Sequence, residues 1–298
     1  MWTEDGGMRT VSLKVVSRIA LAAVCFAVSL GSAAAQSLRS FESNGRSVRV
    51  DEFRAHGGGR GPAVMILHGA SGLGDGTLLY PLARDLADRG INAYVVRYFD
   101  GLAAPAPNVR PAATNNRQPT ARQANTRQTS ARAAPAQRPA RTNFASPGLH
   151  ASRDRVLTDA LSFIRRQPHV DGNRIGLFGL SLGGFHTLDI ASRDRSILAA
   201  VSFVGAMPGN NPEDRSLAAM PPTLLLHGTN DRIVPFQRVQ RLYTAMQQAG
   251  APVQMTTFRG AGHSFRGSDL VRAHDQAATF LEAALLGRGV TTVATRPY

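Results

Sequence analysis

One serine in the sequence stands in a setting that favours nucleophilic chemistry. Ser181 lies in the segment Gly-Leu-Ser-Leu-Gly-Gly, which follows an apolar run at residues 174–178 and precedes a segment compatible with a helix. A serine at such a sharp strand-to-helix turn adopts strained backbone angles, and flanking glycines carry no Cβ that would clash. The G-x-S-x-G pattern therefore predicts Ser181 as a nucleophile, with a helix-capping serine in a glycine-rich turn as the alternative.

A serine hydroxyl needs a general base, and the base needs a carboxylate that fixes its tautomer. Asp231 follows the apolar run 223–226 in the segment His-Gly-Thr-Asn-Asp-Arg-Ile-Val-Pro, and His263 follows the run 253–258 in Gly-Ala-Gly-His-Ser-Phe. Both residues lie on loops at carboxyl ends of expected strands, in the chain order serine, acid, histidine. We expect a Ser181, His263 and Asp231 triad, with His274 as the rival base.

Acyl transfer also needs two backbone N–H groups aimed at the oxyanion of the tetrahedral intermediate. The amide of Leu182, directly after the nucleophile, is the first candidate. The second should come from the loop after the apolar run 63–67, which reads His-Gly-Ala-Ser-Gly-Leu-Gly. We predict that Ala70 supplies this amide, with Ser71 as the alternative, because the neighbouring glycines let the backbone turn inward.

These residues need a scaffold that brings strand ends together. The apolar runs are mostly continuous rather than alternating, which is typical of parallel strands covered on both faces. They alternate with helical patterns, so we expect an α/β fold with a mostly parallel central sheet flanked by helices. The expected strands are residues 47–50, 63–67, 93–98, 174–178, 199–203, 223–226 and 253–258, and the expected helices are 78–88, 153–166, 185–191, 236–248 and 268–286.

Composition narrows the class of protein. The chain has 298 residues, of which 43% are hydrophobic, enough for a substantial core. Its single cysteine, Cys25, excludes a disulfide framework and a multi-thiolate zinc site. His56, His150 and His169 form no spaced ligand cluster with acids or cysteines, so no metal is implied. The expected triad mechanism needs no cofactor.

A low-complexity segment carries half of the net charge of +14. Residues 102–147 contain seven arginines but no acid, are rich in Pro, Ala and Gln, and repeat Arg every five residues from Arg117 to Arg132. Such a segment buries too little apolar surface to offset its ordering entropy, so we expect a disordered insertion. Its arginines could make a weak electrostatic contact with anionic envelope polymers, or reflect neutral expansion of a coding repeat.

The first 35 residues have the pattern of an export signal. Arg9, Lys14 and Arg18 precede an apolar run at 19–30, and Ala-Ala-Ala at 33–35 fits a signal peptidase site. We therefore expect a signal peptide at 1–35, a single domain at 36–298 interrupted by 102–147, and a periplasmic or secreted protein.

Five segments together carry a family resemblance. His-Gly-Ala-Ser-Gly-Leu-Gly at 68–74, Val-Val-Arg-Tyr-Phe-Asp-Gly at 95–101 and the segments around Ser181, Asp231 and His263 resemble an α/β-hydrolase of the dienelactone hydrolase family. The resemblance implies a hydrolase acting on ester or lactone bonds. The enzymes that name that family use a cysteine nucleophile. Because Ser181 takes that place here, the resemblance implies a serine carboxylesterase rather than an enzyme for dienelactone itself.

Other functions remain open from the sequence. Similar segments occur in prolyl-oligopeptidase-like peptidases, and an acyl or acetyl esterase could act on cell-envelope or polysaccharide substrates. A non-enzymatic alternative is an exported binding or scaffold protein on a hydrolase fold. We expect a small-molecule ester as the substrate, no specific nucleic acid partner, and a monomer or dimer.

Overall fold

The structure is a computed structural model that describes residues 36–73, 76–102, 147–209 and 216–287. The predicted signal peptide, 1–35, and residues 103–146 of the predicted insertion lie outside this range. The insertion's predicted end residues are described: Leu102 packs against the core, and a helix begins at Pro147.

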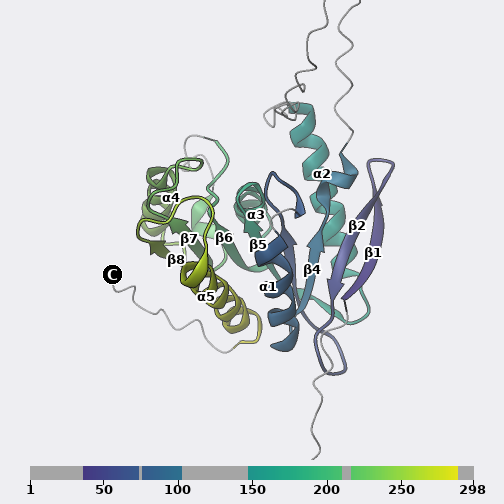
Figure 1. The fold of residues 1–298 in the computed structure, drawn as a ribbon. Coiled ribbons are helices and arrows are strands. Elements are labelled where there is room, and N and C mark those ends of the chain that lie inside the picture. Colours follow the sequence, from purple (N-terminus) through teal and green to yellow (C-terminus); the bar gives the residue numbers. More distant parts are fainter. Residues whose placement is uncertain (1–35, 74–75, 103–146, 210–215, 288–298) are drawn as a thin grey trace, which may run out of the picture. The chain divides into compact units, whose positions relative to one another are not determined.

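The core of the fold is one eight-stranded sheet in the order β1-β2-β4-β3-β5-β6-β7-β8 (Figure 1). Strands β3 to β8 run parallel to one another, whereas β2 runs antiparallel to both β1 and β4. The carboxyl ends of β3 to β8 therefore meet at one edge of the sheet. The strands are β1 (Gln36–Ser43), β2 (Arg46–Phe53), β3 (Gly61–Leu67), β4 (Asn92–Val96), β5 (Val170–Leu180), β6 (Ile197–Phe203), β7 (Thr223–Gly228) and β8 (Val253–Phe258).

Helices cover both faces of the sheet. One apolar core lies between the sheet and α2, α3 and α4, and a second lies between the sheet and α1 and α5 (Figure 1). Burial on both faces explains the continuous apolar runs of the central strands. The helices are α1 (Gly76–Asp88), α2 (Pro147–Arg165), α3 (Leu182–Arg193), α4 (Phe236–Gln248) and α5 (Gly267–Leu285). The predicted α/β class is confirmed.

The structure differs from the predicted elements at two places. Strand β1 was not predicted, because it is a largely exposed outer strand in which only Phe41 and Ser43 are buried. The strand expected at 93–98 ends at Val96, and Tyr98 instead begins a short 3-10 helix, Tyr98–Gly101.

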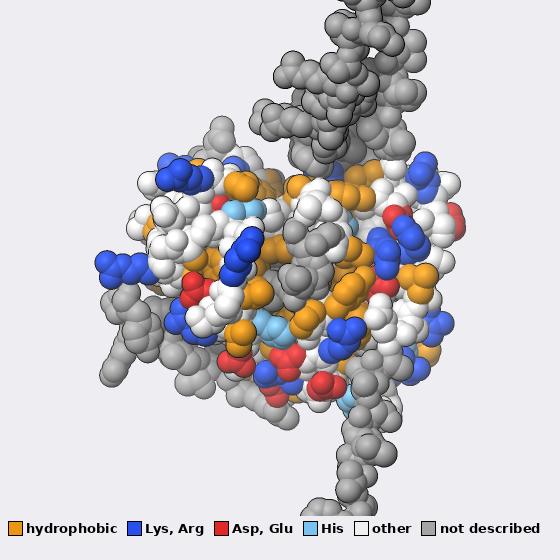
Figure 2. All heavy atoms as spheres, in the orientation of Figure 1, with side chains coloured by type: hydrophobic (Ala, Val, Ile, Leu, Met, Phe, Trp, Pro, Cys, Tyr) orange, Lys and Arg blue, Asp and Glu red, His pale blue; other side chains and the backbone are white. Residues whose placement is uncertain are grey.

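The described helices include none that is long and apolar enough to cross a membrane. Figure 2 shows arginine side chains dispersed over the visible face, with acidic side chains among them. On this face, the folded part does not present one continuous basic patch.

Candidate active site

Ser181 lies between β5 and α3, on the turn that the sequence pattern predicted. Its φ is 52° and its ψ is −113°, a conformation that costs a non-glycine residue about 1–3 kcal/mol. Two backbone hydrogen bonds fix the turn: Ser181 donates to Phe203 O at 2.8 Å, and Phe185 donates to Ser181 O at 3.1 Å. The strain is therefore held in place by the neighbouring strand and by the first turn of the helix.

The glycines around Ser181 allow a very close approach of three elements. A Cβ at Gly179 would overlap the carbonyl oxygen of Gly183, and a Cβ at Gly183 would overlap that of Leu67, the last residue of β3. The start of α3 is thus packed directly on the end of β3. This contact brings the loop after β3 beside Ser181.

His263 connects the serine to the acid. Its Nε2 lies 2.8 Å from Ser181 Oγ, and its Nδ1 lies 2.8 Å from Asp231 Oδ2. Asp231 is buried, whereas the His263 side chain is 16% exposed. The structure thus brings the three predicted residues together in one hydrogen-bonded chain, from loops that follow β5, β7 and β8.

The loops that carry Asp231 and His263 are held to each other by backbone contacts. Asn230 N donates to Ala261 O at 2.9 Å, and Gly260 N donates to Thr229 Oγ1 at 2.9 Å. A Cβ at Gly228 would overlap the carbonyl oxygen of Ala261, so this glycine allows the two loops to meet. The position of the histidine therefore depends on the loop of the acid.

Two backbone amides fix the position of the Asp231 side chain. Its Oδ1 accepts the amides of Ile233 at 2.8 Å and Val234 at 2.9 Å. A second imidazole, His227, is fully buried, with Nε2 2.8 Å from Val234 O and 3.3 Å from Asp231 Oδ2. Burial lowers the pKa of His227. The neutral ring with its proton on Nε2 satisfies both contacts.

The predicted oxyanion donors lie at this edge of the sheet. Leu182 begins α3, where N–H groups have no acceptor within the helix and the helix dipole favours negative charge. Ala70 lies in a tight turn closed by Gly72 N and Gly69 O at 3.0 Å. Its role and that of Ser71 remain predictions.

Three other histidines make contacts with neighbouring residues of the fold. His274 Nε2 contacts Asp85 Oδ2 at 3.3 Å, between α5 and α1. His68 Nδ1 lies 2.8 Å from Gly69 O, and its ring stacks on Tyr98 at 4.1 Å. His186 is buried and contacts the same tyrosine ring. Sequence reasoning missed the contact of His227 with Asp231, although the four-residue spacing of the two residues was a usable signal.

Known proteins share this fold. A dienelactone hydrolase-like promiscuous phosphotriesterase from metagenomic libraries superposes with a TM-score of 0.61 at 18% identity, over 84% of this chain and 99% of that one. Thermogutta terrifontis esterase 2 superposes with a TM-score of 0.57 at 18% identity, over 88% of this chain and 96% of that one. At these identities the likeness concerns the fold alone.

In sequence, the chain is 25% identical over 142 residues to an uncharacterized peptidase, YuxL, of Bacillus subtilis. The matched segment covers 37% of this chain and 22% of that protein. Matched segments span between 22% and 49% of the lengths of the curated relatives. The dienelactone hydrolase family model matches residues 53–283, which include every strand from β3 to β8 and all three hydrogen-bonded residues. The chain therefore belongs to the dienelactone hydrolase family.

Proposed function

We propose that this protein is a serine hydrolase that cleaves carboxylic ester or lactone bonds through an acyl-enzyme. The observation that carries the proposal is the continuous chain from Ser181 Oγ through His263 to Asp231, with both links at 2.8 Å. A serine within hydrogen-bond reach of a base that is itself oriented by a carboxylate is the arrangement that nucleophilic catalysis needs. Family membership supports the same reaction class.

The proposed reaction has two stages. Ser181 Oγ attacks the ester carbonyl carbon while His263 Nε2 takes its proton, and the amides of Leu182 and Ala70 donate to the oxyanion. The C–O bond to the leaving group breaks, and the alkoxide takes the proton from His263. Water then attacks the acyl-enzyme by the same route, releasing the acid and restoring Ser181. Asp231 orients His263 and stabilises the imidazolium in both stages.

A peptidase is the second candidate, because the Bacillus subtilis relative carries a peptidase name. Peptide bonds have a poorer leaving group, so the two candidates separate on paired substrates. We expect hydrolysis of short p-nitrophenyl esters and of simple lactones, and little hydrolysis of the matching amino-acyl p-nitroanilides. Faster p-nitroanilide than ester turnover would assign the protein to the peptidases.

The cellular place is also a proposal. The basic, apolar and small-residue pattern of residues 1–35 supports export to the periplasm or medium, where a cysteine-free mature chain suits an oxidising compartment. N-terminal sequencing of the protein purified from its native cells would test this. A mature chain beginning at Gln36 is expected, and uncleaved intracellular protein would contradict it.

The decisive test uses Ser181→Ala. We expect kcat/KM for a short p-nitrophenyl ester to fall at least about 10³-fold, because the covalent route is lost. A fluorophosphonate should modify the unchanged protein once, at Ser181. A folded protein that is inert to the probe would favour the binding or scaffold alternative, and wild-type turnover in the variant would overturn the mechanism.

A further inference from the structure

A hollow lies at the edge of the sheet opposite Ser181. We call it the amino-edge pocket; it has a volume of about 360 Å³ and is lined by residues 54–61, Gly90, Asn92, Pro168 and His169. These residues come from the loop between β2 and β3 and from the starts of β4 and β5. A strand rises about 3.3 Å per residue, so the seven residues of β3 place the two edges roughly 20 Å apart. A molecule in this pocket would not reach the ester site.

The ionisable groups that line the pocket are all basic. They are Arg54, His56, Arg60 and His169, and no Asp or Glu is among the lining residues. His56 Nε2 is already paired with Asp88 at 3.0 Å. Burial lowers the pKa of His169, which leaves that ring neutral near pH 7. Two positive charges, those of the arginines, therefore dominate the pocket.

Neither guanidinium is in salt-bridge contact with a described carboxylate, although the charge of Arg60 is one cause of the lowered pKa of Asp171. Arg54 and Arg60 form no ion pair with any carboxylate in the described part of the chain, whereas Arg39, a few residues away in the sheet, is paired with Glu52 at 2.9 Å. Arg60 Nε donates to Val170 O at 3.0 Å, which holds its stem against the start of β5. The pocket thus presents two charges that an anion could match.

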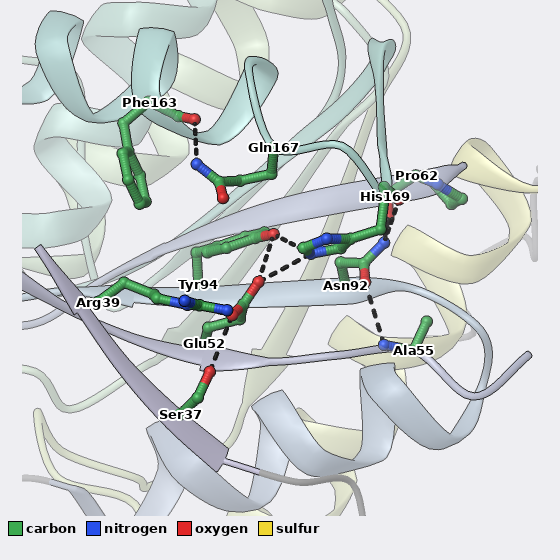
Figure 3. Close-up of polar contacts among 10 residues, drawn as sticks. All are labelled: Ser37, Arg39, Glu52, Ala55, Pro62, Asn92, Tyr94, Phe163, Gln167 and His169. Atoms are coloured by element: carbon green, nitrogen blue, oxygen red, sulfur yellow. Dashed lines mark hydrogen bonds and ion pairs between the residues drawn. The ribbon is translucent and has the colours of Figure 1, made fainter. Parts of the chain in front are cut away.

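The pocket wall is anchored by buried polar groups (Figure 3). The Asn92 side chain is 3% exposed; it accepts the amide of Ala55 at 3.1 Å and donates to Pro62 O at 3.1 Å. Gly61 N donates to His169 O at 3.0 Å. Both ends of the loop that carries the two arginines are therefore fixed to the sheet.

His169 is fixed from the interior side as well. Its Nε2 lies 2.7 Å from Glu52 Oε1 and 2.8 Å from the Tyr94 hydroxyl, as Figure 3 shows. Burial would raise the pKa of Glu52, but hydrogen bonds from Arg39 and Ser37 outweigh it, and the pKa is lowered. Glu52 therefore stays ionised and holds the imidazole in the wall of the pocket.

The glycine run between the arginines offers backbone donors. The amides of Gly57, Gly58 and Gly59 have no acceptor within the described residues. Gly57 has φ 103° and Gly59 has φ 95°, values that favour glycine and keep side chains out of the loop. Unpaired backbone amides next to cationic side chains are a common anion-binding arrangement.

We propose that the amino-edge pocket binds a phosphate group, either as inorganic phosphate or as a phosphomonoester. A phosphate dianion matches the charge of Arg54 and Arg60, and its oxygens accept paired N–H bonds from guanidinium groups. The amides of the glycine run complete the donor set. A monocarboxylate has one charge fewer and two acceptor oxygens, so it should bind more weakly.

The test is calorimetric titration of the full chain with inorganic phosphate, with sodium chloride holding ionic strength constant. The double variant Arg54→Gln and Arg60→Gln should bind phosphate at least about tenfold more weakly, the loss expected from one charge-assisted hydrogen bond. A matched control, Arg117→Gln and Arg122→Gln, removes the same charge from the arginine-rich insertion and should retain the wild-type affinity. An equal loss in the control, no phosphate binding, or equally tight binding of acetate would overturn the proposal.

Two further arms refine the result. Glycerol 3-phosphate that binds more tightly than inorganic phosphate assigns the pocket to phosphomonoesters, and the reverse order assigns it to free phosphate; both support the site. Ester turnover of the double pocket variant should stay within about twofold of the wild-type value, because the two edges are far apart. The binding result therefore stands or falls independently of the proposed hydrolase activity.

Discussion

Substitution of Gly228 by alanine should impair catalysis without touching any reacting group. A Cβ there would overlap the carbonyl oxygen of Ala261 and come within 2.6 Å of that of Gly262, whereas ordinary contact begins at 3.4 Å. The loop must therefore retreat by about 0.8 Å or more, and His263 is the next residue along it. A misplacement of about 1 Å costs on the order of 10²-fold in rate. We expect kcat/KM for a p-nitrophenyl ester to fall by about that factor.

The matched control is Gly262→Ala, which adds the same methyl group one residue from His263. Its Cβ would meet only the carbonyl oxygen of Asn230, at 3.9 Å, which is ordinary contact. We expect its kcat/KM to stay within about threefold of wild type. Circular dichroism and thermal unfolding should show that both variants are folded, with a stability loss of about 1–3 kcal/mol for Gly228→Ala. Near-normal turnover in folded Gly228→Ala would refute the idea that this approach positions His263.

Two other outcomes concern stability. Glu52→Ala should lower the free energy of unfolding by roughly 2–4 kcal/mol in urea titrations, because Tyr94 and His169 lose a buried charged acceptor. The control Asp269→Asn breaks an exposed ion pair with Arg272 and should lower it by less than about 1 kcal/mol. Equal losses in the two variants would contradict this reasoning. His227 has a lowered pKa, so below about pH 6.5 the unfolded state binds a proton that the folded state does not, and stability should fall by up to about 1.4 kcal/mol per pH unit. His227→Gln should reduce that slope between pH 5 and 6.5, and an unchanged slope would show that this histidine does not titrate on unfolding.

The carboxyl-edge site could be predicted because its signals are local. Each of Ser181, Asp231 and His263 lies on the turn or loop that follows an apolar strand, and parallel strands bring their ends to one edge. Strand β1 gave no hydrophobic signal because most of its side chains are exposed. Its turn could have been found, because the dipeptide Asn44-Gly45 is typical of a two-residue hairpin turn. Such a turn requires positive φ at both residues, and both have it.

The amino-edge pocket and the contact at Gly228 could not be predicted in this way. The pocket depends on Asn92 and His169 meeting a loop that precedes β3, and no spacing in the sequence relates these segments. The role of Gly228 depends on a backbone carbonyl more than thirty residues later in the chain. Such contacts arise from the three-dimensional packing of strands and loops, which carries no local pattern.

The location of His263 has a consequence for how the protein could lose activity. Among the described strands, β8 pairs with β7 alone, and four of its six residues are only partly buried. Outer strands with few buried apolar contacts open at lower free energy than the centre of a sheet. Opening of β8 would displace His263, the proposed general base, while Ser181 stayed on its turn in the middle of the sheet. Heat or mild denaturant should thus abolish turnover before the core unfolds, and amide exchange in β8 should be the best measure of the enzyme's working stability.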